Sequence, residues 1–85
     1  MKRIVCSVFD SATQLFGQPF FVPARGAAMR SFKDEVNRRS PDNSLANHPE
    51  DYTLYQLATF DDETGEFETA RELMARGKDL QEVAQ

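Results

Sequence analysis

One segment constrains the fold of this chain more than any other, because residues 49–67 combine a strand, an acidic turn and a return strand. Residues 52–60 are rich in aromatic and β-branched side chains, which favour strands. The acids at 61–63 lead to Gly65, and a glycine supplies the positive φ that closes a type I turn with a bulge. The pattern predicts a β-hairpin with strands over 52–60 and 66–69.

The N-terminal part of the chain predicts two further strands. Residues 2–10 alternate and are rich in Ile and Val, as is typical of a strand. Residues 14–22 also have strand composition, but Gly17 and Pro19 interrupt them. Since proline has no N–H to donate to a ladder, we expect this second strand at an edge of the sheet or bulged at that point.

An amphipathic helix is expected over residues 24–39. Pro23 suits the start of a helix, where a missing N–H is tolerated. Ala28, Phe32 and Val36 follow at intervals of four and would form one apolar face. A loop rich in helix breakers is expected over 40–49.

The expected elements follow one another in the order strand, strand, helix, strand, strand (ββαββ). This order predicts an α+β fold, in which a four-stranded antiparallel sheet packs on one amphipathic helix. Residues 1–69 would form this domain. Residues 70–85 have helical composition and are expected to form a C-terminal helical tail, which Gly77 divides into two short pieces. The apolar residues of this tail are Leu73, Met74, Leu80 and Val83.

A single helix covers only one face of such a sheet, yet aromatic side chains are expected on both faces. Strict alternation places Tyr55 and Leu57 on one face of the third strand, and on the other Leu54, Ala58 and Phe60. On the second strand, alternation separates the pair Phe16 and Phe20 from the pair Leu15 and Phe21. The second face would be covered by the tail, by another subunit, or by stacked bases.

Composition and motifs exclude several classes of site. The single cysteine, Cys6, excludes an intrachain disulfide and a cysteine-based zinc cluster. His48 has no second His or Cys near it, and the acids at 61–63 lack the spacing of a calcium loop. With no phosphate-binding glycine loop and no nucleophile motif, we expect no enzyme, no metal and no cofactor. No apolar run has the length of a membrane span, and no signal peptide is expected.

The charges are distributed unevenly along the chain. Residues 1–39 hold seven Lys or Arg against three acids, whereas residues 40–70 hold eight acids and no Lys or Arg. An overall acidic protein still binds nucleic acid where a local basic patch exists. Opposite charges in two parts of one domain also favour self-association. The charge pattern leaves both interpretations open.

Three motifs carry a resemblance to a known family: residues 49–67, Ser-Val-Phe-Asp-Ser at 7–11 and Pro-Phe-Phe at 19–21. Together they resemble the small nonstructural protein of gokushoviruses, tail-less icosahedral phages of the Microviridae with single-stranded DNA genomes. The resemblance covers roughly residues 1–68. It implies a DNA-binding protein of the host bacterial cytoplasm that acts in the switch from duplex replication to single-strand synthesis.

Resemblance and residues together predict a phage nonstructural protein that binds single-stranded DNA without strong sequence preference, in genome replication or packaging. The residues expected to contact phosphates are Lys2, Arg3, Arg25, Arg30, Lys33, Arg38 and Arg39. Those expected to stack on bases are Phe16, Phe20 and Tyr55. The chain is also expected to form a homo-oligomer, a dimer or higher, because apolar groups on both sheet faces exceed what a small monomer normally exposes.

A second hypothesis is a non-enzymatic interaction protein. In this alternative the chain is a scaffolding or regulatory module that binds a capsid or replication protein through its acidic half and its tail. The position of the basic side chains discriminates the two hypotheses. A continuous positive surface favours DNA, whereas positive charges dispersed in ion pairs favour a protein partner.

Overall fold

The computed structural model describes residues 1–82, so Val83 of the expected tail lies outside the described part. The described chain forms one open antiparallel sheet with short helices. The sheet order is β2-β1-β4-β5, with β3 paired to β1. The strands are β1 (Lys2–Asp10), β2 (Leu15–Phe16), β3 (Phe20–Val22), β4 (Tyr52–Asp61) and β5 (Phe67–Arg76). The helices are α1 (Arg25–Val36), α2 (Ser44–Asn47), η1 (Pro49–Asp51) and α3 (Gly77–Leu80).

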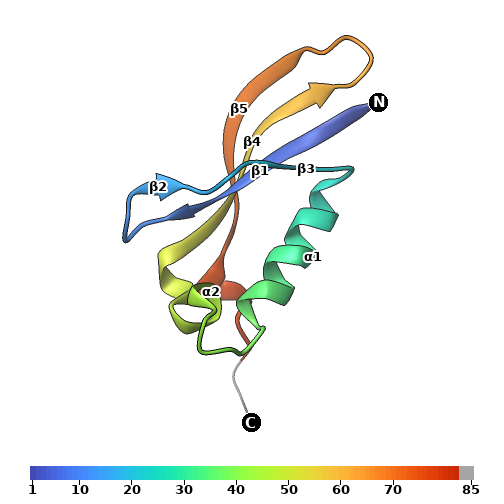
Figure 1. Cartoon of the computed structure of the whole chain (residues 1–85). Coiled ribbons are helices and arrows are strands. Elements are labelled where there is room, and N and C mark those ends of the chain that lie inside the picture. Colours follow the sequence, from blue (N-terminus) through green and yellow to red (C-terminus); the bar gives the residue numbers. More distant parts are fainter. Residues whose placement is uncertain (83–85) are drawn as a thin grey trace.

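The molecule is elongated, with extents of 47 × 25 × 20 Å. The helices gather at one end of the sheet, and the β4–β5 hairpin extends beyond them at the other end (Figure 1). None of the helices in residues 1–82 combines the length and apolar character that a membrane crossing requires.

The expected α+β class is confirmed, as are the first strand and the hairpin. β1 spans the expected residues, and β4 and β5 pair in antiparallel register around the acidic turn. Gly65 has a φ of 77°, the left-handed conformation expected at the end of the turn.

The interrupted edge strand is also confirmed. β2 and β3 both pair with β1 and are separated by the segment that contains Gly17 and Pro19. Within this interruption the Gly17 N–H donates to the Val8 carbonyl at 2.8 Å, and the Ser7 hydroxyl donates to the Gly17 carbonyl at 2.7 Å. The interruption is therefore fixed by hydrogen bonds to β1.

The expected helical tail is wrong over residues 70–76, which belong to strand β5. Their helical propensity is overruled because the unpaired backbone of β4 offers a ladder of hydrogen bonds, and tertiary pairing outweighs intrinsic preference. Helix begins only at Gly77 and lasts four residues. Gly77 thus marks the change from strand to helix, whereas the sequence suggested a break between two helices.

The core lies between α1 and one face of the sheet. The expected apolar face of the helix is confirmed, since Ala28, Phe32 and Val36 are buried. They pack against Cys6 of β1 and Leu54 of β4, both of which are completely buried. Desolvation raises the pKa of the Cys6 thiol, in keeping with its position in the core.

Side-chain amides fasten the segment after β5 to the helical layer. The Asn37 amide donates to the Leu80 carbonyl at 3.0 Å, and its oxygen accepts from the Glu82 N–H at 2.6 Å. Gln81 donates to the carbonyls of Val36 and Ala46. Residues 77–82 therefore lie beside the helices and do not cover the opposite face of the sheet.

A bulge in β4 changes which residues share a face. Gln56 pairs with Cys6 and Ala58 pairs with Val5, so Leu57 has no partner in β1. The extra residue reverses the alternation, and Ala58 and Phe60 consequently lie on the same face as Tyr55. The strict alternation expected from the sequence is wrong at this point.

Candidate nucleic-acid interface

The face of the sheet opposite α1 carries two groups of aromatic rings. In the first group, the Phe9 and Phe16 rings have centroids 4.8 Å apart, and Tyr55 meets Phe16 edge to face at 5.4 Å. In the second, the Phe60 and Phe67 centroids lie 4.7 Å apart, and those of Phe21 and Phe60 lie 5.6 Å apart. We call this surface the open face.

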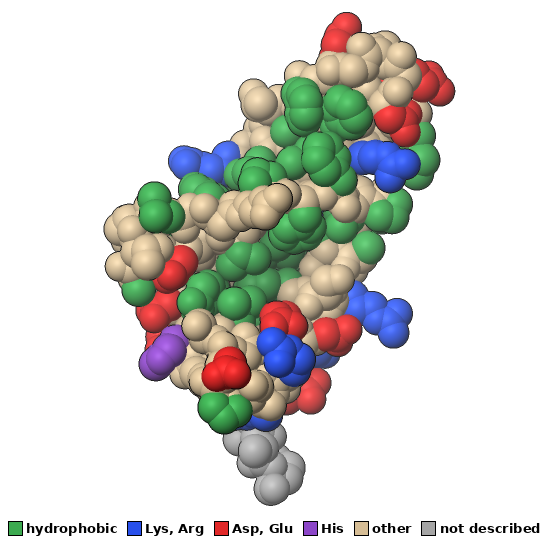
Figure 2. All heavy atoms as spheres, viewed as in Figure 1, with side chains coloured by type: hydrophobic (Ala, Val, Ile, Leu, Met, Phe, Trp, Pro, Cys, Tyr) green, Lys and Arg blue, Asp and Glu red, His purple; other side chains and the backbone are tan. Residues whose placement is uncertain are grey.

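Several of these rings are accessible to solvent. The exposed fractions are 38% for Phe16, 50% for Phe21 and 57% for Phe67. Figure 2 shows hydrophobic side chains at the surface below the hairpin tip, with acidic side chains at the tip itself. Such a concentration of exposed apolar groups marks an interaction surface more often than an ordinary solvated one.

The cations of the open face come from β1 and β5. Arg3 pairs with Phe60, and Arg76 pairs with Thr53, whose other neighbour is Phe9. Arg71 lies between Thr69 and Leu73, which pair with open-face residues of β4. Because alternate residues of a strand share a face, Arg71 occupies an open-face position as well.

No acid occupies an open-face strand position in residues 1–82, as the pairing register shows. At the rim, the Arg3 Nε lies 3.4 Å from an Asp62 carboxylate oxygen. Arg71 and Arg76 form no ion pair within the described residues. The open face therefore combines aromatic rings with positive charge, which is the combination that single-stranded nucleic acid requires.

Two of the three basic side chains of α1, in contrast, are engaged with acids of the same chain. Arg25 donates to the Gln56 side chain and lies 3.3 Å from the Glu72 carboxylate. The Lys33 ammonium lies 3.6 Å from the Glu82 carboxylate. Arg30 is exposed and makes no ion pair within residues 1–82.

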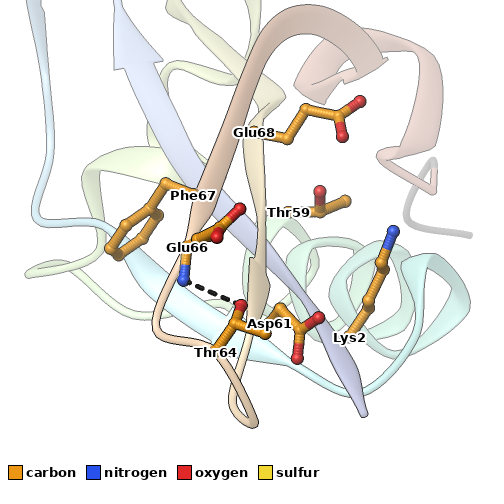
Figure 3. Close-up of a pocket in the computed structure, with 7 residues that line it drawn as sticks. All are labelled: Lys2, Thr59, Asp61, Thr64, Glu66, Phe67 and Glu68. Atoms are coloured by element: carbon orange, nitrogen blue, oxygen red, sulfur yellow. Dashed lines mark hydrogen bonds between the residues drawn. The ribbon is translucent and has the colours of Figure 1, made fainter.

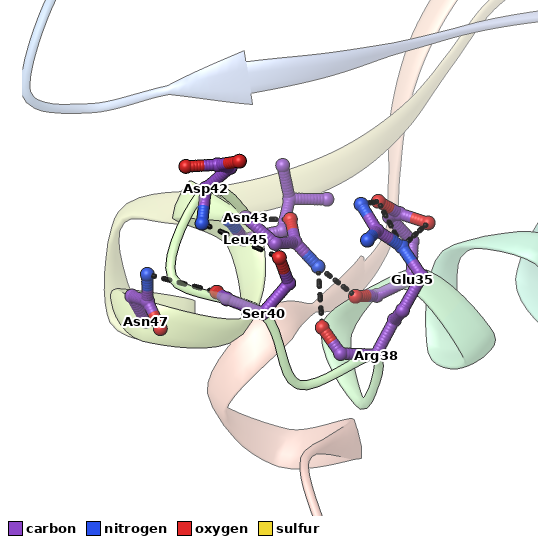
Figure 4. Close-up of polar contacts among 7 residues, drawn as sticks. All are labelled: Glu35, Arg38, Ser40, Asp42, Asn43, Leu45 and Asn47. Carbon is purple, nitrogen blue, oxygen red and sulfur yellow. Dashed lines mark hydrogen bonds and ion pairs between the residues drawn. The ribbon is translucent and has the colours of Figure 1, made fainter.

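Arg38 and Arg39 continue the same pattern beyond α1. Arg38 makes a bidentate contact with Glu35 at 2.6–3.1 Å, which holds the pKa of that carboxyl below its usual range (Figure 4). Arg39 donates to the Glu82 carbonyl at 3.0 Å. Apart from Arg30, the positive charges expected to form one phosphate-binding patch on the helix are thus dispersed among separate contacts.

Lys2 lies at the hairpin end of the sheet, on the face that continues from the helix side. It lines a hollow together with three acids, Asp61, Glu66 and Glu68 (Figure 3). The acids outnumber the single ammonium, so this hollow is a poor environment for a phosphate.

The three aromatic residues expected to stack on bases fall on different faces. Phe16 and Tyr55 are together on the open face. Phe20 pairs with Cys6 and packs against the core, because the interruption at Gly17 and Pro19 breaks the alternation between β2 and β3. Phe20 is therefore not part of the open face.

Sequence reasoning missed most of the open face. It did not select the cations Arg71 and Arg76 or the rings Phe9, Phe21, Phe60 and Phe67. The missing signal was in β5, where Phe67, Thr69, Arg71 and Leu73 alternate with two acids and Ala70. Read as a strand, this alternation would have placed the Phe67 ring and the Arg71 cation on one face and Glu68 and Glu72 on the other.

One group of potential metal ligands occurs in the described residues, although none was expected. Ligand atoms of His48, Glu50 and Asp51 lie within 4.8 Å of one another at the start of β4. His48 and Glu50 are exposed and Asp51 is half-buried, and the His48 Nδ1 lies 3.9 Å from a Glu50 carboxylate oxygen. Exposed carboxylates of this kind also occur as plain surface groups.

Comparison with protein families identifies the family of the chain. A family model described as Phage ORF5 protein matches residues 3–80, a segment that extends through β5 and α3. No curated protein and no solved structure matches the chain. Because the family model spans nearly the whole sequence, from β1 to the last helix, this chain belongs to the Phage ORF5 protein family.

Proposed function

We propose that this phage protein binds single-stranded DNA through the open face of its sheet, without strong sequence preference. The observation that carries the proposal is the composition of that face: six aromatic rings and three arginines, with no acid at a strand position in residues 1–82. The rings offer surfaces on which bases stack, and the arginines offer charge to phosphates.

The chemistry of the face favours single strands over duplexes. Bases in a duplex are already stacked and paired, so rings on a sheet reach them only after the helix opens. Phosphate contacts carry no base information, and every base has a π-face, so binding of this kind tolerates any sequence. In a protein of a phage family, DNA binding of this kind would serve genome replication or packaging in the host bacterial cytoplasm. We propose further that the chain is a small nonstructural protein of a phage of the Microviridae, which would have such a role.

Two charge-matched double variants test the proposal. Arg71→Glu with Arg76→Glu reverses two charges on the open face, whereas Arg30→Glu with Lys33→Glu reverses two charges on α1. Both change the net charge equally. In fluorescence anisotropy at low salt with an unstructured oligo-dT, we expect the first variant to bind at least about tenfold more weakly than wild type. The second should stay within about threefold of wild type, because only long-range charge is altered.

Equal loss in the two variants would mean that binding follows net charge and would overturn the assignment to the open face. Failure of the wild-type protein to bind at low salt would reject DNA binding altogether. Circular dichroism of both variants supplies the control for folding, since all four positions are exposed.

A non-enzymatic scaffolding or regulatory protein is the second candidate function. It is favoured by the ion pairs that Arg25, Lys33 and Arg38 form with acids of the same chain. Charges dispersed in this way suit a protein partner, here a viral capsid or replication protein. A homo-oligomer in which a second copy covers the open face belongs to this candidate, and it would compete with DNA for the same rings.

A further inference from the structure

The aromatic rings of the open face do not form one continuous platform. One group consists of Phe9, Phe16 and Tyr55 and the other of Phe21, Phe60 and Phe67, so each takes one ring from the split edge strand, Phe16 or Phe21. On β4, Tyr55 and Phe60 lie about 13 Å apart, because they pair with Ser7 and Arg3, which are four residues apart on β1 at about 3.3 Å per residue.

Between the two groups, β1 and β4 carry the pair Val5 and Ala58 and the bulged residue Leu57, while Ser7 lies at the register of Tyr55. Ser7 is completely buried, and Val5 and Ala58 each expose 5% of their surface. The Ser7 hydroxyl is already used, because it donates to the Gly17 carbonyl. This interval thus offers no ring for stacking. Its polar side chains are Thr69 and Arg71 of β5, and the Arg71 guanidinium suits a phosphate of the DNA backbone.

The arginines are spaced along the same axis as the rings. Arg76 lies at the register of Phe9, Arg71 lies near the middle of the interval, and Arg3 lies opposite Phe60. A backbone that runs along the sheet would therefore meet a positive charge at each ring group and one between them.

From this arrangement we propose that each protomer has two separate base-stacking subsites joined by a stretch that holds only the DNA backbone. This inference rests on the proposed function and specifies its ligand. A single strand advances about 3.4 Å per nucleotide when stacked and about twice that when extended, so about two to four nucleotides span the interval. The ligand is then a segment of about six nucleotides, with its terminal bases on the rings and its central bases free.

Hexanucleotides with abasic sites test the two-subsite arrangement directly. The probes are dT6, dT6 with abasic positions 3 and 4, and dT6 with abasic positions 1, 2, 5 and 6, compared by competition against a labelled oligomer at low salt. We expect the centrally abasic probe to bind within about twofold of dT6. The terminally abasic probe should bind at least about tenfold more weakly, since it loses the stacked bases.

A second readout uses the intrinsic fluorescence of the protein. The chain has no Trp and two Tyr, and Tyr52 packs against the core. In a Tyr52→Phe variant, Tyr55 is the one remaining Tyr fluorophore. Stacking should quench it with dT6 and with the centrally abasic probe, and the terminally abasic probe should leave it bright. Phe60→Leu with Phe67→Leu should weaken dT6 binding without preventing this quenching.

The outcomes separate the inference from the function on which it rests. If the centrally abasic probe lost as much affinity relative to dT6 as the terminally abasic probe, the rings would form a continuous platform. That result would overturn the inference alone. Equal, salt-sensitive binding of all three probes would show that only phosphates are contacted and would overturn it as well. Failure of every probe to bind would instead reject the proposed function.

Discussion

The Phe16 and Tyr55 rings meet edge to face, with an interplanar angle of 68° and centroids 5.4 Å apart. They come from β2 and β4, strands that are not neighbours in the sheet, and Phe9 of β1 lies between them. Contacts of this kind stabilise a protein by about 0.5–1.5 kcal/mol beyond the burial of area. The ring group is therefore held by the sheet itself and is in place before any ligand arrives.

Gly77 should not tolerate a side chain. A Cβ at this position would lie 2.5 Å from the Pro49 carbonyl oxygen and 3.2 Å from that of Tyr52, and neither backbone atom moves cheaply. We expect Gly77→Ala to lower the free energy of unfolding by about 2 kcal/mol or more, measured by urea denaturation. Gly26 in α1 is the matched control, because a Cβ there meets nothing within 4 Å. Gly26→Ala should be neutral or stabilising by up to about 1 kcal/mol, and similar losses in both variants would contradict the close contact.

Asn43 should be the most sensitive polar residue of the loop after α1. Its buried amide donates to the carbonyls of Glu35 and Arg38, each at 2.8 Å, and its oxygen accepts from the Leu45 N–H (Figure 4). Asn43→Ala leaves these groups unsatisfied and should lower the free energy of unfolding by about 1–3 kcal/mol. The exposed Asn47, which donates over 3.2–3.4 Å, provides the comparison. Asn47→Ala should lower the free energy of unfolding by less than about 0.5 kcal/mol. A larger loss at Asn47 than at Asn43 would show that Asn43 is not the more important of the two side chains.

The Glu35–Arg38 contact gives stability a small dependence on acid pH. Hydrogen bonds from Arg38 lower the pKa of Glu35 in the folded protein. The stabilisation is therefore complete above the unfolded pKa and is lost as pH falls through the folded pKa. Because the pair is exposed, the effect is about 0.2–1 kcal/mol. In thermal melts near pH 7, the melting temperature of wild type should be higher than that of Glu35→Gln. This difference in melting temperature should vanish near pH 3. A difference that persists at low pH would show that the carboxylate charge is not its cause.

Asp62 should weaken DNA binding by its contact with Arg3. The same carboxylate accepts from the Met1 ammonium at 2.9 Å and lies 3.4 Å from the Arg3 Nε, and these contacts lower its pKa. Asp62→Asn removes the negative charge beside a proposed phosphate contact. We expect its affinity for oligo-dT at low salt to rise about twofold to fivefold, an effect that fades as salt screens the charges. The exposed Asp42, near the helices, is the control, and Asp42→Asn should leave the affinity unchanged.

The local elements of this fold were predictable, and the assignment of side chains to faces was not. The hairpin around Gly65, the helix face with Phe32 and the interrupted edge strand follow from local composition and turn chemistry. The alternation over residues 67–73 is too weak a strand signal to oppose the helical composition of residues 70–76, and pairing with β4 decides in favour of the strand.

The residues of the candidate site could not be predicted without knowing which face of the sheet each side chain occupies. One unpaired residue, Leu57, moves Phe60 to the side of Tyr55, and the interruption before β3 moves Phe20 into the core. Bulges of this kind have no dependable sequence signature, and each reverses the face of every residue beyond it. The pairing of Arg25 with Glu72 joins residues far apart in the chain, so no local pattern indicated that Arg25 lies outside the basic patch.

The salt dependence of binding to single-stranded DNA tests the central claim most directly. With one phosphate contact for each of Arg3, Arg71 and Arg76, the slope of log K against log salt should be about −2 per protomer, at about −0.7 per phosphate on single strands. Arg71→Gln with Arg76→Gln should reduce the slope to about −0.7, whereas Arg38→Gln should leave it unchanged. Absence of binding at low salt by the folded protein, or a slope that responds to Arg38 and not to Arg71 and Arg76, would contradict the account.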